Sequence, residues 1–240
     1  YGIGTKEDPA LKYASELGNM IGNTDYTFNA LKEELQKIGA TINFFSNGDY
    51  FGLNIKGFDK NFQKTIAMAG DFLSTMKVRK EDEKKLKKLI QSSTLERKFE
   101  ARDASIKGNA LREFALWGQN SSFLTRATTN EVKKMESDFL MERITNAMNH
   151  ETTVFYTGTK EVSEVKSSVS KHLIINNDLT PSSSPLVYDQ KLNSENTVYF
   201  YNDKKAVQSQ IHILISGDSM ALNDRLTART FNKYLGSGMS

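Results

Sequence analysis

Two short runs of alternating apolar and polar residues lie on either side of Asn47-Gly48. One runs from Ile42 to Ser46 and the other from Phe51 to Ile55. An Asn-Gly pair between two alternating runs is a strong signal for a β-hairpin. Strands of this kind have one apolar face that other elements must cover. The hairpin therefore excludes an all-helical bundle and requires helices with apolar stripes elsewhere in the chain.

Several segments have the helical spacing that this cover needs. Between Phe62 and Met76, apolar residues recur at intervals of three and four, which predicts a helix with one core-facing stripe. Comparable stripes and end signals predict the other helices. These are a helix after Asp8-Pro9 that ends at Gly22-Asn23, one over Phe28–Ile38 between Thr27 as N-cap and Gly39, one from Lys80 to beyond Phe99, Ala104–Trp117, one from Asn130 to Met148, Val162–Leu173, and a last helix from Leu222 to Tyr234.

Further strands are expected at Thr152–Tyr156 and near Thr197–Tyr201 and Gln208–Ser216. The predicted fold class is α+β, with a mainly antiparallel sheet and helices packed on one face. The one composition shift is Ile175–Pro185, which holds two of the three prolines. We therefore expect a first domain over 1–178, a linker over 179–185, and the truncated start of a second, similar domain over 186–240.

Composition excludes several classes of protein. The chain has no cysteine, which removes disulfides, thiolate zinc sites and cysteine nucleophiles. A net charge of +3 is too small to argue for nucleic acid or an anionic membrane, and no apolar run is long enough to span a membrane. Tyr1 at one end and Gly236–Ser240 at the other suggest that the chain is cut from something longer.

The side chains that could carry chemistry are scattered. His150, His172 and His212 share no helical spacing that would place two metal ligands on one face. Lysines 84, 85, 87 and 88 alternate with acidic residues, which is typical of a solvated helix face rather than a nucleic-acid patch. The carboxylate pairs Glu33-Glu34 and Glu96…Glu100 fall on exposed helix faces. No nucleophile elbow or phosphate loop is present, so these residues alone indicate no active site.

Several strings in this order resemble the pitrilysin/insulinase-type (inverzincin) zinc metallopeptidases. They are Gly2-Ile3-Gly4-Thr5 before a helix, Gly22-Asn23-Thr24, Leu31-Lys32-Glu33-Glu34-Leu35-Gln36-Lys37-Ile38-Gly39-Ala40, an Asn-Gly-Asp hairpin ending near Gly57, the helix with Phe62 and Leu73, Val154-Phe155-Tyr156-Thr157-Gly158, and Phe231 to Ser240. The resemblance covers essentially the whole chain. It implies a domain similar to those of LuxS and the processing peptidases.

The resemblance also implies two homologous halves that close around a peptide. One half carries the motif H-x-x-E-H, whose histidines help to hold zinc and whose glutamate activates water. With Thr24 as the counterpart of the family's Gly-Thr, the motif positions fall on Ala14, Leu17 and Gly18, none of which can bind zinc or act as a base. The family's later catalytic Arg and Tyr would lie beyond Ser240. The chain thus resembles the non-catalytic half, with no catalytic, cofactor or metal residue of its own.

The function that this resemblance implies is enclosure and positioning of a peptide substrate. Its partners would be a catalytic, zinc-bearing peptidase half, on the same chain or a separate subunit, and the peptide itself. Two alternatives stay open: a scaffold subunit that binds a partner protein without meeting substrate, and a basic, helix-rich nucleic-acid binder. If the source is bacterial, a periplasmic or cell-envelope location is expected. No nucleic acid and no membrane span are expected.

Overall fold

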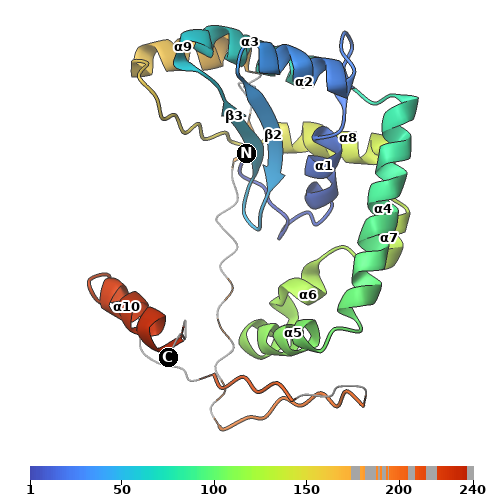
Figure 1. Cartoon of the computed structure of the whole chain (residues 1–240), viewed down its shortest axis with the longest axis vertical. Helices are drawn as coiled ribbons and strands as arrows, with labels where there is room; N and C mark the ends of the chain where they lie inside the picture. The colour runs from blue at the N-terminus through green and yellow to red at the C-terminus, as the bar shows by residue number, and fades with distance from the viewer. Residues whose placement is uncertain are drawn as a thin grey trace.

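The structure is a computed structural model that describes residues 1–173, 179–181, 188, 190, 193, 195–204, 209–214 and 221–236 (Figure 1). The described helices are α1 (Leu11–Gly18), α2 (Phe28–Lys37), α3 (Phe62–Thr75), α4 (Lys80–Glu100), α5 (Ala104–Trp117), α6 (Ser122–Thr125), α7 (Thr129–Lys133), α8 (Ser137–Met148), α9 (Val162–His172) and α10 (Asp224–Gly236), with short 3-10 helices η1 (Asp59–Asn61) and η2 (Gly118–Asn120). The described strands are β1 (Gly22–Asn23), β2 (Thr41–Ser46), β3 (Phe51–Lys56) and β4 (Met76–Lys77).

The sheet is much smaller than the sequence pattern suggested. The described strands form two antiparallel pairs, β1 with β4 and β2 with β3, and helices make up most of the regular structure. The fold is therefore α+β, but the prediction of a mainly antiparallel sheet is wrong. Residues 152–156 form no strand, because this segment lies across a groove from β3 instead of against it. Residues 197–201 and 209–214 form no strand either, and Gln208 and Ser216 lie outside the described residues.

The predicted hairpin is confirmed, with a register that pairs Ile42 with Ile55 and Ser46 with Phe51. Its loop is longer than the Asn-Gly pair alone. The Asn47 side-chain oxygen accepts hydrogen bonds from the backbone N–H groups of Asp49 (2.9 Å) and Tyr50 (2.8 Å). Asn47 thus closes a four-residue turn through its side chain, a common use of asparagine.

Helix α1 lies at the centre of the main core. Its buried side chains share that core with Phe44 of β2 and with Leu140 and Ile144 of α8. The helix begins at Leu11, after the Asp8 carboxylate accepts a hydrogen bond from the Ala10 N–H (3.0 Å). It ends at Gly18 rather than at the predicted Gly22-Asn23, because those two residues pair with Lys77 and Met76 in the β1–β4 ladder.

The helix predicted from Asn130 to Met148 is two helices, α7 and α8. Thr128, not Asn130, caps the first of them: its hydroxyl accepts from the Glu131 N–H (3.3 Å), and the Glu131 carboxylate accepts from the Thr128 N–H (2.6 Å). This capping box places the helix start two residues earlier than expected. In contrast, the predicted Thr27 cap and the Gly39 stop, with φ of 66°, are both confirmed.

The long helix α4 runs away from the hairpin and carries α5 and α6 at its far end (Figure 1). Tyr199 and Asp203 contact α5: the Tyr199 ring packs edge-on against Phe114, and Asp203 pairs with Lys107 at 2.6 Å. Most of the predicted linker lies outside the described residues. Within the part of the chain that the structure describes, no helix is both long enough and apolar enough to cross a membrane.

Candidate functional site

The three positions aligned with the zinc motif lie in the main core. Ala14 and Leu17 are fully buried, and Gly18 is buried against the ring of Phe44. A Cβ atom at Gly18 would lie 2.4 Å from Cδ2 of Phe44, far inside van der Waals contact. Phe44 itself is held between the rings of Phe51 and Phe72. This part of α1 therefore has no space in which a metal ligand could project.

The three histidines do not come together. His150 follows α8 with its Nδ1 3.0 Å from the Asn146 carbonyl oxygen, His172 is the last residue of α9, and His212 is exposed. Among the described residues, no three histidine, aspartate or glutamate side chains are close enough to hold a metal ion. The histidines that the sequence singled out thus have no shared site.

The lysine run of α4 and the carboxylate pairs singled out in the sequence are either exposed or held in ion pairs. Lys84, Lys87 and Lys88 are exposed, whereas Lys85 pairs with the buried carboxylate of Asp82 at 2.8 Å. The remaining carboxylate pairs are likewise dispersed: Glu33 and Glu96 are exposed, Glu34 pairs with Lys37, and Glu100 pairs with Arg126. The hydrogen bond from Arg126 lowers the pKa of Glu100. These groups form surface and inter-helix contacts, and no acid–base pair.

A groove of about 900 Å³ borders strand β3. Its other wall is the extended segment 151–157, and the apolar side chains of α3 and α9 line it between these two walls. Aromatic side chains stand exposed at its margin, with Phe155 at 93% and Phe58 at 62% exposure. Sequence reasoning missed this groove, because its walls are separated by about a hundred residues and no local pattern joins them.

The backbone of β3 faces this groove. Tyr1 and Phe51 exchange two backbone hydrogen bonds, from the Tyr1 amino group (2.9 Å) and from the Phe51 N–H (3.4 Å). The N–H and C=O of Phe51 therefore point away from β2. Because this direction alternates along an antiparallel ladder, the N–H and C=O groups of Leu53 and Ile55 point the same way. In the described part of the chain these groups have no backbone partner.

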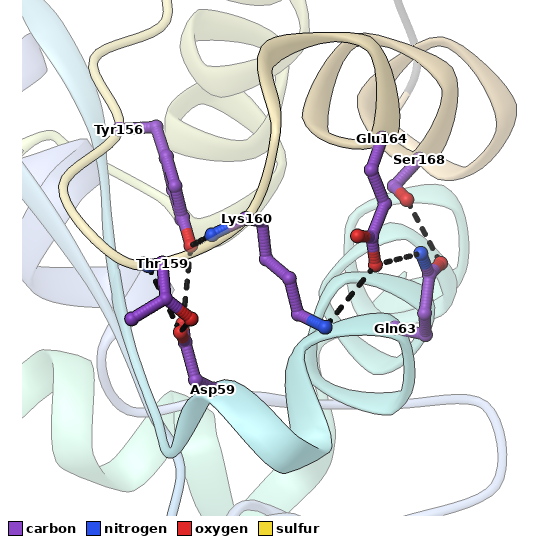
Figure 2. Close-up of polar contacts among 7 residues, drawn as sticks. All are labelled: Asp59, Gln63, Tyr156, Thr159, Lys160, Glu164 and Ser168. Carbon is purple, nitrogen blue, oxygen red and sulfur yellow. Dashed lines mark hydrogen bonds and ion pairs between the residues drawn. The ribbon is translucent and has the colours of Figure 1, made fainter.

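A polar cluster fastens the far wall of the groove to η1 (Figure 2). The Asp59 carboxylate accepts hydrogen bonds from the Tyr156 hydroxyl (3.0 Å), the Thr159 N–H (2.9 Å) and the Thr159 hydroxyl. The Tyr156 hydroxyl in turn accepts from the Lys160 N–H (3.1 Å). One carboxylate thus holds the end of the extended segment beside the start of α3.

A second group of contacts continues from this cluster to α9. Gln63 of α3 donates to Glu164 (3.3 Å) and accepts from the Ser168 hydroxyl (2.8 Å), as Figure 2 shows. Lys160 lies 3.4 Å from the same Glu164 carboxylate. Behind these polar contacts, Phe62 and Ile66 pack on Val165 and Val169. Together the two groups join residues 156–169 to η1 and α3.

The Asp59 cluster leads to a pH-dependent prediction. The hydroxyl and N–H of Thr159, with Tyr156 and Lys160, hold the pKa of Asp59 below its ordinary value of 3.8. A lowered carboxyl pKa in the folded state contributes stability above the unfolded-state pKa, and this contribution is lost as the pH falls through the folded-state pKa.

We therefore expect Asp59→Asn to lower the melting temperature at neutral pH and to have progressively less effect in acid. Thermal unfolding followed by circular dichroism over a pH series measures this difference, and Thr159→Val is the companion variant. A melting-temperature difference that does not change with pH would contradict the prediction.

Several known structures that resemble this chain are peptidases or peptidase domains. No family model matches the sequence, and no curated protein matches it. The ferredoxin protease FusC, solved as its E83A mutant with Arabidopsis ferredoxin, superposes with a TM-score of 0.63 at 13% identity, covering 76% of this chain and 20% of FusC. The peptidase M16 inactive domain from Pseudomonas fluorescens gives 0.57 at 11% identity, with 77% and 47% covered. The first half of the periplasmic protease PqqL from Escherichia coli gives 0.53 at 14% identity, with 80% and 43% covered.

This chain spans less than half the length of each of these structures. At these identities the likeness concerns the fold. It confirms at that level the resemblance to the pitrilysin/insulinase-type peptidases, which are the M16 peptidases. The chain has the fold of an M16 peptidase domain.

Proposed function

We propose that this chain is the non-catalytic half of an M16-type zinc metalloendopeptidase, and that it helps to enclose and position peptide substrate. The observation that carries the proposal is the burial of Ala14, Leu17 and Gly18 in the core, with Gly18 against Phe44, in a fold otherwise like that of M16 peptidase domains. A catalytic zinc site needs three converging protein ligands. Here the counterpart of the motif helix carries apolar side chains that belong to the core.

The proposal assigns zinc and catalysis to a partner half, on the same polypeptide or on a separate subunit. It retains a first domain over 1–178, a linker over 179–185 and the start of a second, similar domain over 186–240. Solved relatives of this fold include a domain described as inactive and a protease half, which supports the division of labour. Since PqqL is a periplasmic protease, we propose a periplasmic or cell-envelope location if the source is bacterial.

The groove beside β3 is the surface that we propose for positioning the peptide. An extended peptide can add to a sheet edge through main-chain hydrogen bonds, and neighbouring pockets then select its side chains. The outward backbone groups of Leu53 and Ile55 supply the edge, and the aromatic side chains of Phe58 and Phe155 supply apolar contact area. An extended segment joined to Tyr1 and running antiparallel to β3 would meet the same backbone groups.

The metal content of the purified chain tests the non-catalytic assignment. We expect no stoichiometric zinc after dialysis and no chelator-sensitive cleavage of an unstructured peptide, because the counterparts of the ligands are apolar. Mass-spectrometric metal analysis and a peptide-cleavage assay measure the two quantities. Tightly held zinc at one ion per chain, or proteolysis that a chelator abolishes, would overturn the assignment and the alignment on Thr24.

Peptide binding separates positioning from a scaffold role. We expect a fluorescein-labelled peptide of alternating valine and threonine residues to bind, and we expect Ile55→Pro to weaken that binding. Proline there removes an N–H that faces the groove and leaves the ladder to β2 intact. Ile55→Val is the matched control. Absence of peptide binding would favour the scaffold role. If binding is lost when the chain is extended before Tyr1 by the residues of a longer parent protein, those residues occupy the β3 edge, and this result would also count against peptide positioning there.

A further inference from the structure

The hairpin has two outer edges, and only one of them borders the groove. On β2, the residues whose backbone groups point outward are Ile42, Phe44 and Ser46, because each lies opposite an outward-pointing residue of β3. An isolated two-stranded sheet exposes such groups on both sides, and either side can pair with an extended peptide. The two edges of this hairpin differ in what they contact.

A side chain already occupies the β2 edge. The Asn19 amide oxygen accepts a hydrogen bond from the Phe44 N–H (2.7 Å), and the Asn19 amide nitrogen donates to the Phe44 carbonyl oxygen (2.9 Å). These two bonds are the pair that a residue of a neighbouring strand would make with Phe44. A carboxamide can satisfy both groups because it carries one acceptor and two donors side by side.

The position of Asn19 is fixed by its own backbone. Asn19 is the C-terminal cap of α1, and its N–H donates to the Ser15 carbonyl oxygen (3.1 Å). The hydroxyl of Ser15 lies 3.2 Å from that of Ser46, one outward position further along β2. Two side chains from the end of α1 therefore contact this edge, Asn19 at Phe44 and Ser15 at Ser46, and Asn19 makes both hydrogen bonds to the β2 backbone.

We propose that Asn19 is the residue that closes the β2 edge to strand addition and so directs an extended peptide to the β3 edge. The proposal rests on the proposed function, since it concerns which edge receives the peptide. Asn19 acts here as an intramolecular substitute for a strand: a peptide that pairs with Phe44 must first displace two hydrogen bonds held by a helix end. Among the residues that the structure describes, no hydrogen-bonding group occupies the outward backbone groups of Leu53 and Ile55 in this way.

The test uses Asn19→Ala and a photo-cross-linking version of the valine–threonine peptide. Because two existing hydrogen bonds no longer compete, we expect cross-linking to residues 41–46 to increase about tenfold over the unsubstituted chain. Asn19→Asp keeps the acceptor but loses the donor, so its increase should be smaller. Asn43→Ala, which removes an exposed amide from a residue that pairs with Asn54 inside the hairpin, is the matched control.

The double variant Asn19→Ala/Ile55→Pro tests cross-linking to β2 when peptide binding at the β3 edge is weakened. Appearance of a β2 cross-link there supports the role of Asn19 even if the unsubstituted chain binds no peptide. A folded Asn19→Ala chain, verified by circular dichroism, that gains no cross-link to residues 41–46 would overturn the inference. Binding at β3 in that chain would leave the proposed function standing.

Discussion

Gly18→His, which restores one residue type of the zinc motif, is expected to destabilise the chain by about 3 kcal/mol or more and to bind no zinc. The Cβ atom alone would lie 2.4 Å from the Phe44 ring, and that ring is itself packed against Phe51 and Phe72. An imidazole needs still more space, so either the ring leaves the core or the end of α1 moves. Urea unfolding monitored by circular dichroism measures the loss.

Two further variants test whether the clash with the Phe44 ring causes this loss of stability. Gly18→Ala should show a smaller loss of about 1–3 kcal/mol, because a single methyl group meets the same ring. Gly48→Ala is the control: the atoms nearest to its Cβ would belong to the flexible side chain of Lys6, the first of them at 3.1 Å. A Gly18→His chain as stable as the parent would show that Phe44 can move away, and the apolar packing would then no longer argue against a metal site.

Leu140→Ala is expected to cost about 2–5 kcal/mol of unfolding free energy. Leu140 is fully buried in the core that α8 shares with α1, so truncation leaves a cavity between elements more than a hundred residues apart in the chain. The same variant should raise amide hydrogen exchange in α1 as well as in α8, because each helix covers the other. Denaturant titration and hydrogen–deuterium exchange measure these two effects.

Leu124→Ala is the matched control for this substitution. Leu124 is 54% exposed in α6, at the far end of α4, and its truncation should change the stability by about 0.5 kcal/mol or less. Equal losses at the two positions would mean that α6 belongs to the same cooperative core. That result would contradict the expectation that α6, at the far end of α4, contributes little to the stability of the core formed by α1 and α8.

The sequence was most informative where structure depends on neighbours within a few residues. The stripes that predicted α2, α3 and α4 are confirmed, as are the Thr27 cap and the hairpin around Asn47. Helix periodicity and turn chemistry are local, so one sequence suffices to read them. The absence of ligating side chains at Ala14, Leu17 and Gly18 is equally a property of the sequence, once the positions are aligned.

Tertiary structure decided which extended segments pair and which surfaces stay open. Residues 152–156 are β-branched and aromatic, as in a strand, yet they form one wall of a groove, with Tyr156 and the nearby Thr159 hydrogen-bonded to Asp59 of η1. Asn19 falls inside the first helix predicted from the sequence, yet in the structure it is the C-terminal cap of α1 and its side chain occupies the edge of β2. Pairing and closure of sheet edges depend on contacts between residues distant in the chain, and no local periodicity records those contacts.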